Sequence, residues 1–486
     1  MVMAIVLATL GVMSSYTVVL LIIGFLFKAK KFNPTDKKYK YAVLIAARNE
    51  EVVVGNLIDS IRKQDYPSKF IEIFVIAHNC TDKTAQSARE AGAVVYELSN
   101  TSPKQHRKSY ALDFALQNIK KDYATAAQPN GIKNFDGFFV FDADNLIATD
   151  YITEMNKAFD VPKYDFFSSY LSDKNIKTRF IPSYAAMSLY SVSLNQSRPL
   201  GLLGCSPRIR GRGMLFRNEL LKEGWKWNTL LEDGEAGLVF MSRGIRGTHV
   251  EAAELFDECP HTFKDFTRQR LRWARGAWAV FFQRYHQILF GIIWPRRLKR
   301  DPDAVPPYKY VPQGKNRFTR GCKKFGWYFL DGLQKRFSCY NRAMSIFPRA
   351  TITLIYGFLY PLGMAIYISA TGDIAGLKMA VILVSSFYGA VYLSAFWNNL
   401  ATIVRESKRI RCNTLRLFTY TFFWPFIQMY LEYLKLYALF VPIKWKVIPH
   451  IQSSQIEEVA DRQTLASKFI DFVGEMEAEN GKLGSS

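Results

Sequence analysis

Residues 139–144 read FVFDAD, an apolar run that ends in two carboxylates separated by one alanine. The aromatic and β-branched residues predict a buried strand. Alternate side chains of a strand point to the same face, so Asp142 and Asp144 can converge on one hard cation, which prefers oxygen ligands and often keeps a nucleotide phosphate. Aspartates are also common in turns, so this motif alone fits a metal site and a plain turn about equally.

The chain around this motif alternates between predicted strands and helices. Strands are expected at YAVLIAA (41–47), IEIFVIAHN (71–79) and AVVYEL (93–98), and helices at VVVGNLIDSIRKQ (52–64) and SYALDFALQNI (109–119). This alternation predicts one α/β domain over residues 37–276, with a mostly parallel sheet and helices on both faces. Ligands of such sheets bind beyond the carboxyl ends of the strands, where the two aspartates fall.

Two further motifs follow in the same domain. Glu232 and Asp233 open LEDGEAGLVF, where acidic residues suit the first turn of a helix or a general base beside a sugar. Residues 269–273 read QRLRW and place two cations and an indole on one amphipathic stretch. Arginine suits phosphate and an indole face suits a sugar ring, but the same residues would also anchor an interfacial helix. For each motif, the spacing of the residues alone does not distinguish the structural interpretation from the functional one.

Apolar segments at both ends predict a membrane protein. Met1–Phe27 carries no charge and can span a bilayer of about 30 Å, and the lysines that follow it place the next domain in the cytosol. Ile352–Ala370 and Met379–Val404 predict a membrane hairpin. Leu415–Val441 contains a proline and a Glu–Lys pair, so it fits a third span or a bent interfacial helix.

We therefore expect a multi-pass protein of the cell membrane with a cytosolic catalytic domain. Its five parts are a transmembrane helix (1–28), the α/β domain (37–276), an interfacial basic region (277–349), a C-terminal transmembrane region with two clear spans and a third (350–441), and a tail (442–486). Residues 296–349 carry 14 Lys and Arg against three Asp and interleave them with aromatics, a composition typical of a layer at the membrane surface.

The composition limits the class of partner. With 486 residues, 49% of them hydrophobic, the chain is neither a disordered tail nor one small domain. Its net charge of +22 requires an anionic partner: nucleic acid, anionic lipid headgroups or a phosphate-bearing substrate. Because the basic aromatic region directly precedes a predicted membrane hairpin, we expect anionic lipids of the bilayer and no nucleic acid. The six cysteines show no CxxC spacing, which excludes a zinc finger.

The order of motifs resembles a known family. DxD, then ED, then QRLRW followed by ARG, between an N-terminal span and a C-terminal hairpin, is similar to the processive family 2 glycosyltransferases, which include cellulose, chitin and hyaluronan synthases and related bacterial polysaccharide synthases. The resemblance covers about residues 40–280 in motif and the whole chain in layout. It implies an α/β GT-A (nucleotide-diphospho-sugar transferase) domain combined with α-helical transmembrane and interfacial helices.

The resemblance also implies roles for individual residues. Asp233 would be the catalytic base, and Asp142 and Asp144 would hold Mg²⁺ or Mn²⁺. The donor-binding residues would be Glu50, Asp82, Lys108, Asp142, Gln269, Arg270 and Arg272, and the acceptor-binding residues Trp273, Glu232, Gly211 and Arg212. Lys108 would equally suit an ordinary helix start. The arginines Arg208, Arg210 and Arg212 replace a stretch that is usually uncharged in cellulose synthases, so plain cellulose synthesis is not implied.

We therefore expect a membrane-embedded, inverting, metal-dependent hexosyltransferase. It would polymerise a β-linked exopolysaccharide, a β-glucan or related β-glycan, from UDP-glucose or UDP-N-acetylglucosamine onto a growing glycan acceptor. Its own membrane helices would secrete the product, with room for a secretion partner. One alternative is a non-processive enzyme that adds a single sugar to a membrane lipid. A non-catalytic membrane scaffold is the other, and the intact motifs disfavour it.

Overall fold

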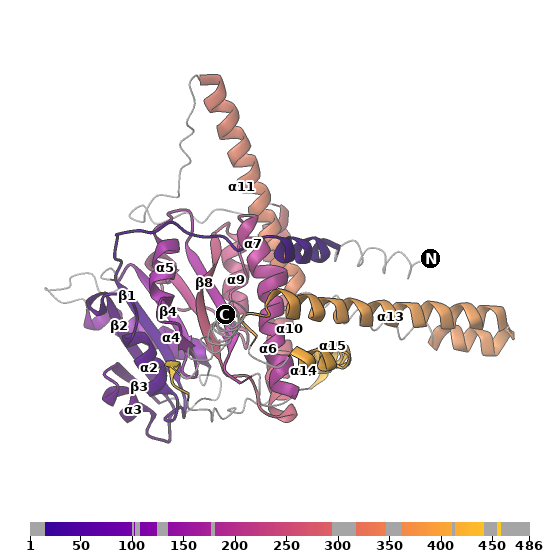
Figure 1. The fold of residues 1–486 in the computed structure, drawn as a ribbon, viewed down its shortest axis with the longest axis horizontal. Coiled ribbons are helices and arrows are strands. Elements are labelled where there is room, and N and C mark those ends of the chain that lie inside the picture. Colours follow the sequence, from indigo (N-terminus) through magenta and orange to yellow (C-terminus); the bar gives the residue numbers. More distant parts are fainter. Residues whose placement is uncertain are drawn as a thin grey trace, which may run out of the picture.

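The sheet that carries the FVFDAD strand is mixed and eight-stranded, in the order β3-β2-β1-β4-β7-β6-β8-β5 (Figure 1). It belongs to a computed structural model that describes residues 15–99, 102, 107–123, 135–175, 180–293, 317–346, 362–372, 374–410, 414–441 and 454–457.

The first half of the sheet is parallel, as predicted. Its strands are β1 (Tyr41–Ala47), β2 (Ile71–His78), β3 (Val94–Leu98) and β4 (Gly137–Asp142). Tyr41 pairs with Ile71 on one side and with Gly137 on the other, so the strands end at one edge. The connecting helices are α2 (Val54–Arg62), α3 (Thr84–Glu90) and α4 (Lys108–Asp122).

The second half departs from the parallel expectation. Its strands are β5 (Leu146–Ile147), β6 (Phe166–Asp173), β7 (Met214–Arg217) and β8 (Gly247–Asp257). Strand β7 runs antiparallel to both β4 and β6, and β5 runs antiparallel to β8, while β6 and β8 are parallel. Strand β6 reads FFSSYLSD and is buried throughout. Its serines lower the mean hydropathy of this stretch, so hydropathy alone does not reveal a core strand there.

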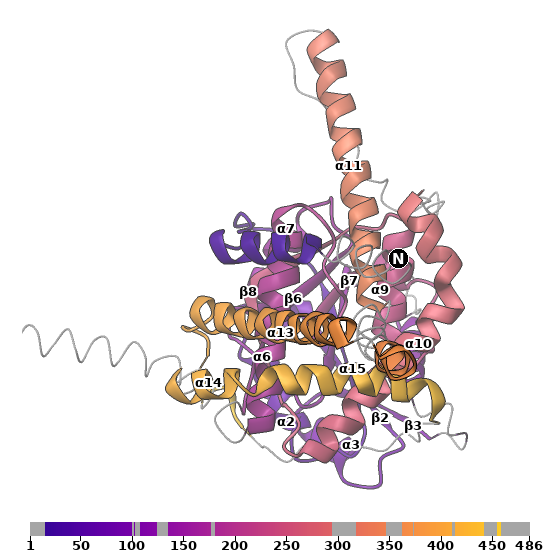
Figure 2. The same cartoon turned by 90° about the vertical axis from the view of Figure 1, so that its right-hand side faces the viewer.

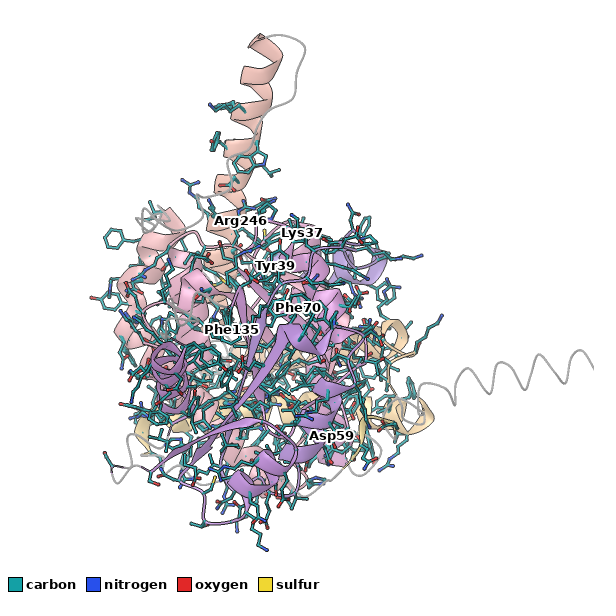
Figure 3. All side chains as sticks on the ribbon, turned by 90° about the vertical axis from the view of Figure 1, so that its left-hand side faces the viewer. Lys37, Tyr39, Asp59, Phe70, Phe135 and Arg246 are labelled. Carbon is teal, nitrogen blue, oxygen red and sulfur yellow. The ribbon has the colours of Figure 1, made fainter. Side chains whose placement is uncertain are left out.

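The sheet is covered on both faces, as predicted. Alternate residues of β1, including Tyr41 and Val43, pack with α2 and α5 (Tyr151–Phe159) in one core. The intervening residues, including Leu44, pack with α4 and α9 (Glu232–Ser242) in the other. Tyr39 and Phe70 pack on the first core and Phe135 belongs to the second; all three are labelled in Figure 3. The period of two along the strand therefore places one helix layer on each side.

Further helices gather on the side of the sheet where α6 and α10 lie (Figure 2). They are α6 (Phe180–Val192), α7 (Arg198–Leu202), α10 (Phe263–Ile293), α11 (Arg317–Ile346), α13 (Ile374–Arg405), α14 (Thr414–Thr421) and α15 (Trp424–Phe440). Helix α10 contacts α9, α11 and α15, and it runs unbroken through residue 276, where we placed the end of the α/β domain. Helices α11 and α13 project outward (Figure 1).

Within the described ranges, no helix combines the length and the hydropathy needed to cross a bilayer. Of the predicted spans, residues 1–14 and 352–361 lie outside the described residues, as do residues 294–316 and 347–349 of the basic region and most of the tail. The predicted spans stay predictions.

A buried ion network connects the outer helices to the sheet. The guanidinium of Arg198 on α7 pairs with Glu251 on β8, with Nε 2.7 Å from Oε2, and with Glu406 beyond α13. The side chains of these three residues are 4%, 8% and 3% exposed. Tyr170 on β6 donates to Glu406 at 2.8 Å. Arg409 Nη1 also lies 3.5 Å from Glu251 Oε1, so two cations offset two buried carboxylates from distant parts of the chain, and Arg198 is the one that both carboxylates share.

Replacing Arg198 with methionine should therefore destabilise the protein strongly. The change leaves Glu251 and Glu406 buried without their shared cation, and breaking such a pair costs about 3–5 kcal/mol. Thermal or denaturant unfolding of purified protein would measure the loss. The exposed Arg243, changed to methionine, is the matched control and should alter stability little. Equal unfolding midpoints for the two variants would contradict this account.

Candidate functional site

A cavity of about 970 Å³ lies at the carboxyl ends of β1, β2, β4 and β8. Its walls include residues of α6, α9, α10, α11 and α15. This is the edge of the sheet at which the sequence predicted a ligand. The lining includes Glu50, Lys108, Asp142, Asp144, Gly211, Arg212, Glu232, Asp233, Gln269, Arg270, Arg272 and Trp273. All predicted site residues except Asp82 therefore meet in one cavity.

The DxD carboxylates stand at the end of β4, where the chain turns. The Asp142 N–H donates to Asn145 Oδ1 at 2.9 Å, and the Asn145 N–H returns to the Asp142 carbonyl at 3.1 Å, which closes the turn. Asp144 is 4% exposed. Asn145 Nδ2 donates to Asp257 Oδ1 at 3.0 Å, so the ends of β4 and β8 are fixed together. The turn interpretation of the motif is thus confirmed, and the same two aspartates line the cavity, where metal binding stays a prediction.

Two cations hold the carboxylate of Asp142. Lys108 begins α4, and its ammonium bonds Asp142 and donates to the carbonyl of Gly211 at 2.8 Å. Arg212 places Nη2 2.6 Å from Asp257 Oδ2 and Nη1 3.8 Å from Asp142 Oδ2. A lysine at a helix start is therefore also a residue of the site, and Arg212 joins the DxD aspartate to the end of β8.

The carboxylates suit a divalent cation in their chemistry. Burial raises the pKa of Asp257 to about 7, and the charges of Asp144 and Asp142 add to the rise although Arg212 opposes it. Three mutually repelling carboxylates are the donor type that Mg²⁺ or Mn²⁺ prefers. In the described part of the chain, no group of three or more acidic, His or Cys side chains is preassembled around a metal position. Asp142 and Asp144 would thus supply two ligands, and a diphosphate would supply others.

The pair Glu232 and Asp233 forms the first turn of α9, the helix start that the sequence allowed. Asp233 Oδ1 accepts a hydrogen bond from the Gly234 N–H at 2.6 Å. Gly211 lies against the other oxygen: its φ is +74°, and a Cβ there would stand 3.3 Å from Asp233 Oδ2. Glycine suits position 211 for two reasons: its backbone is left-handed, and a side chain there would crowd the Asp233 carboxylate.

Burial perturbs both carboxylates. It raises the pKa of Glu232 to about 7, and the neighbouring charge of Asp233 adds to the rise. Burial also raises the pKa of Asp233, while Arg342, Lys108 and Arg212 oppose that effect. The two carboxyl groups therefore share one buried position, in which nearby cations limit the rise in the pKa of Asp233. A base set beside cations in a cleft is typical of a catalytic site.

The QRLRW run occupies the first half of α10 and faces the cavity. Arg270 lies over the Trp273 ring at 4.5 Å and over Phe266 at 5.0 Å, and it donates to Ser188 Oγ at 3.2 Å. Arg272 Nε has no hydrogen-bond partner among the described residues. The structure thus supports the phosphate and sugar-facing reading of this motif as well as the interfacial-helix reading.

Asp82 lies outside the cavity lining. Its carboxylate accepts hydrogen bonds from the Thr84 N–H at 3.1 Å and from the Glu51 N–H at 3.2 Å. It therefore shapes the loop after β2, whereas His78, at the end of that strand, lines the cavity.

Arg342 and Asp257 also line the cavity, although they were not predicted from the sequence as site residues. Arg342 lies within the predicted interfacial region but is 4% exposed and lines the cavity from α11. No local motif marked it, because its position depends on how α11 packs against α9. Asp257 lies at the end of a strand, as Asp142 does, and this position is what made Asp142 a candidate site residue. Asp257 was not a candidate because strand β8 was not predicted from the sequence.

A mixed α/β sheet with a DxD pair at one strand end, an acidic helix start and a cationic helix across the cavity defines a GT-A-like nucleotide-sugar transferase domain. Residues 39–276 match the family described as "Glycosyltransferase like family 2", so this domain belongs to glycosyltransferase family 2.

Relatives with assigned names match this part of the chain. A beta-monoglucosyldiacylglycerol synthase of Nostoc sp. is 26% identical over 256 residues, 51% of this chain and 51% of that protein. The probable glycosyltransferase YdaM of Bacillus subtilis is 26% identical over 244 residues, 49% of this chain and 55% of that protein. A 4,4'-diaponeurosporenoate glycosyltransferase of Staphylococcus aureus is 38% identical over 85 residues, 17% of this chain and 21% of that protein. The chain spans about half the length of the first two.

Among solved structures, a mannosyltransferase from Pyrobaculum calidifontis is similar with a TM-score of 0.44 and 18% identity. The match covers 79% of this chain and 98% of that one. A likeness of this degree carries no argument about function.

The raised pKa of Glu232 predicts a pH-dependent stability. A carboxyl whose pKa is higher in the folded state destabilises the protein as it ionises, so stability should fall as pH rises from about 4.5 to about 7 and then level off. Glu232→Gln removes this ionisation, so its unfolding temperature relative to that of the wild type should rise as the pH increases from 5 to 8. Thermal unfolding across this range measures the difference.

The exposed Glu223, changed to glutamine, serves as the control and should differ from the wild type by a constant amount over the same range. A gap between Glu232→Gln and the wild type that does not change with pH would show that Glu232 has an ordinary pKa.

Proposed function

We propose that this protein transfers one hexose from a UDP-sugar to a membrane lipid, as an inverting, metal-dependent glycosyltransferase. The observation that carries the proposal is the single cavity in which the DxD carboxylates, Asp233 and the QRLRW run meet. UDP-glucose and UDP-N-acetylglucosamine are the proposed donors, as the resemblance to family 2 synthases implies.

The lipid acceptor has two supports. Two of the named relatives act, by their names, on lipid-like acceptors, a diacylglycerol and a diaponeurosporenoate. The cavity also has an apolar side, which includes Val192 of α6's C-terminal end, Met344 and Ile346 of α11 and Leu431 of α15. Such a wall suits an acyl or isoprenoid chain better than a hydrated glycan.

Attachment to a membrane surface, with the catalytic domain on the cytosolic side, is part of the proposal. Helix α10 exposes Phe282, Tyr285, Leu289, Phe290 and Ile293, which recur at helical spacing on one side. An exposed apolar stripe of this kind is typical of helices that lie in the bilayer interface. The predicted spans would add to this anchorage.

The proposed chemistry follows from the positions of the charges. Asp233 takes the proton of an acceptor hydroxyl, and the oxygen attacks the anomeric carbon from the face opposite the diphosphate. The new glycosidic bond forms as the bond from the anomeric carbon to the phosphate oxygen breaks, and UDP leaves with that electron pair. Lys108 and Arg272 are placed to stabilise the negative charge on the diphosphate. A divalent ion held by Asp142 and Asp144 would supply further neutralisation of that charge.

Changing Asp233 to asparagine should abolish most transfer. Loss of a positioned base lowers the rate about 10²- to 10⁴-fold. Transfer of radiolabelled sugar from each UDP-sugar to lipid vesicles would measure the rate, and UDP affinity should stay within about twofold. Asp59→Asn is the matched control: Asp59 is exposed on α2 and is labelled in Figure 3 away from the cavity. Near wild-type transfer by Asp233→Asn would remove Asp233 from this role.

Polymerisation of a β-glycan is the second candidate, and Trp273 favours it. The indole lies in the cavity beside Arg270, and its face suits the terminal sugar of a growing chain. Secretion of such a polymer through the predicted membrane helices belongs to this candidate alone.

The size of the product separates the two candidates. For single-sugar transfer, we expect one organic-soluble glycolipid whose mass exceeds that of the acceptor lipid by one sugar residue. Chromatography and mass spectrometry of the labelled product would measure this. A ladder of products, or an ethanol-insoluble polymer degraded by a β-glycan hydrolase, would favour the second candidate instead.

A further inference from the structure

A group of cations lies near Asp233 and is distinct from Lys108 and Arg212, which pair with Asp142. Arg342 of α11 and Arg208, in the loop before β7, both line the cavity there. Arg210 continues the group toward Arg212. The proposed chemistry uses Lys108 and Arg272 for the diphosphate, and it assigns no role to Arg208 and Arg342.

The guanidinium of Arg342 occupies a space that two glycines leave open on α9. A Cβ added at Gly234 would stand 2.6 Å from Arg342 Nη2, and one added at Gly237 would stand 3.6 Å from Arg342 Nε. Arg342 Nη1 donates to Ser345 Oγ at 3.2 Å. Its Nε is buried and has no hydrogen-bond partner among the residues that the structure describes. The residue is only 4% exposed, so a cation with unused donor capacity is fixed beside Asp233.

The cost of this arrangement is electrostatic. Burial lowers the pKa of Arg342 to about 9, the charge of Arg208 lowers it further, and Asp233 opposes both effects. Burial likewise lowers the pKa of Arg210 to about 9, and Arg212 and Arg208 add to the fall. Buried like charges are destabilising unless an anion lies among them. Asp233 cannot serve as a lasting counter-ion, because it becomes protonated in the proposed reaction.

The position of Asp233 indicates which substrate the extra cations face. Asp233 must contact the acceptor hydroxyl, with the donor diphosphate on the side of Asp142. Arg342 lies beside Asp233 and is not one of the cations that pair with Asp142, so we assign it to the acceptor side, where Met344 and Ile346 of the same helix also line the cavity. A ligand that matches this wall carries a negative group close to the reacting hydroxyl and an apolar chain.

We propose that Arg342 and Arg208 bind a phosphate group of the acceptor, so that the lipid glycosylated by this protein is a phosphate-bearing lipid and not a neutral one. This inference rests on the proposed function and names the acceptor class for it. Arginine suits this role because its planar fork binds phosphate oxygens in pairs.

The test compares two lipids with similar acyl chains and free hydroxyls. Vesicles of phosphatidylcholine would carry either phosphatidylglycerol or diacylglycerol as acceptor, with the UDP-sugar that the donor panel selects. We expect the wild type to have a higher kcat/KM for phosphatidylglycerol. Arg342→Gln should lower the ratio of kcat/KM for phosphatidylglycerol to that for diacylglycerol about 10- to 100-fold, mainly through the KM for phosphatidylglycerol, while UDP affinity changes less than about twofold. Arg342→Lys, which keeps the charge but not the fork, should fall between.

Lys324→Gln is the matched control, because Lys324 is an exposed cation on the same helix. It should leave the preference between the two lipids unchanged, which separates phosphate recognition from general attraction to an anionic surface. A wild type that uses diacylglycerol as well as phosphatidylglycerol would overturn the proposal. Equal losses on both lipids in Arg342→Gln would also overturn it, since Arg342 would then act only through Asp233.

A binding measurement separates this proposal from the proposed function. Isothermal titration of glycerol 1-phosphate into protein saturated with UDP tests the anion site without turnover. Binding by the wild type and its loss in Arg342→Gln would support the site even if no sugar were transferred. Transfer with no such binding, or binding that Arg342→Gln retains, would overturn the site and leave the proposed function intact. Glycosylation of free glycerol 1-phosphate at the lipid rate would show that the phosphate is recognised without its lipid chain.

Discussion

The carboxylate of Asp142 stands between two cations, and the geometry of the cavity depends on this interaction. Lys108 connects that carboxylate to the carbonyl of Gly211, which in turn lies against Asp233. Arg212 connects it to Asp257 at the end of β8. This carboxylate thus links the end of β4 to the first turn of α9 and to the end of β8. Under the proposed function, loss of its charge would separate the donor half of the site from the acceptor half.

The sheet explains why these groups can meet. Parallel strands bring β1, β2 and β4 to one edge, and each strand end supplies polar residues there. The reversal at β7 brings β8, with Asp257, to the same edge from the other half of the chain. Helices α9 and α10 then close the cavity from the opposite side. The cavity therefore combines carboxylates fixed by strands with cations fixed by helices, and each set offsets the burial cost of the other.

Most of the first half of the fold could be predicted from sequence, because strands β1 to β4 are mostly apolar and α2 has a clear helical period. Strand β6 could not be, because its serines are buried by long-range pairing that no local pattern reveals. The same holds for the site. Asp142 and Asp233 lie in short motifs, whereas Arg342 belongs to a helix whose composition indicated a membrane surface. Its role depends on a contact with α9 made across more than a hundred residues.

The charged residues of helix α11 lie in two different environments. Its first part exposes Lys324 and Phe325, the mixture of cation and aromatic side chain that suits lipid headgroups. Further along, it buries Asp331 and Arg342: Asp331 pairs with Arg246, which is labelled in Figure 3, and Arg342 lines the cavity. Under the proposed function, the segment predicted to lie at the membrane surface would be continuous with the acceptor side of the site. A single helix would in this way hold the reacting group of a lipid near Asp233 while its outer half remained at the bilayer from which that lipid comes.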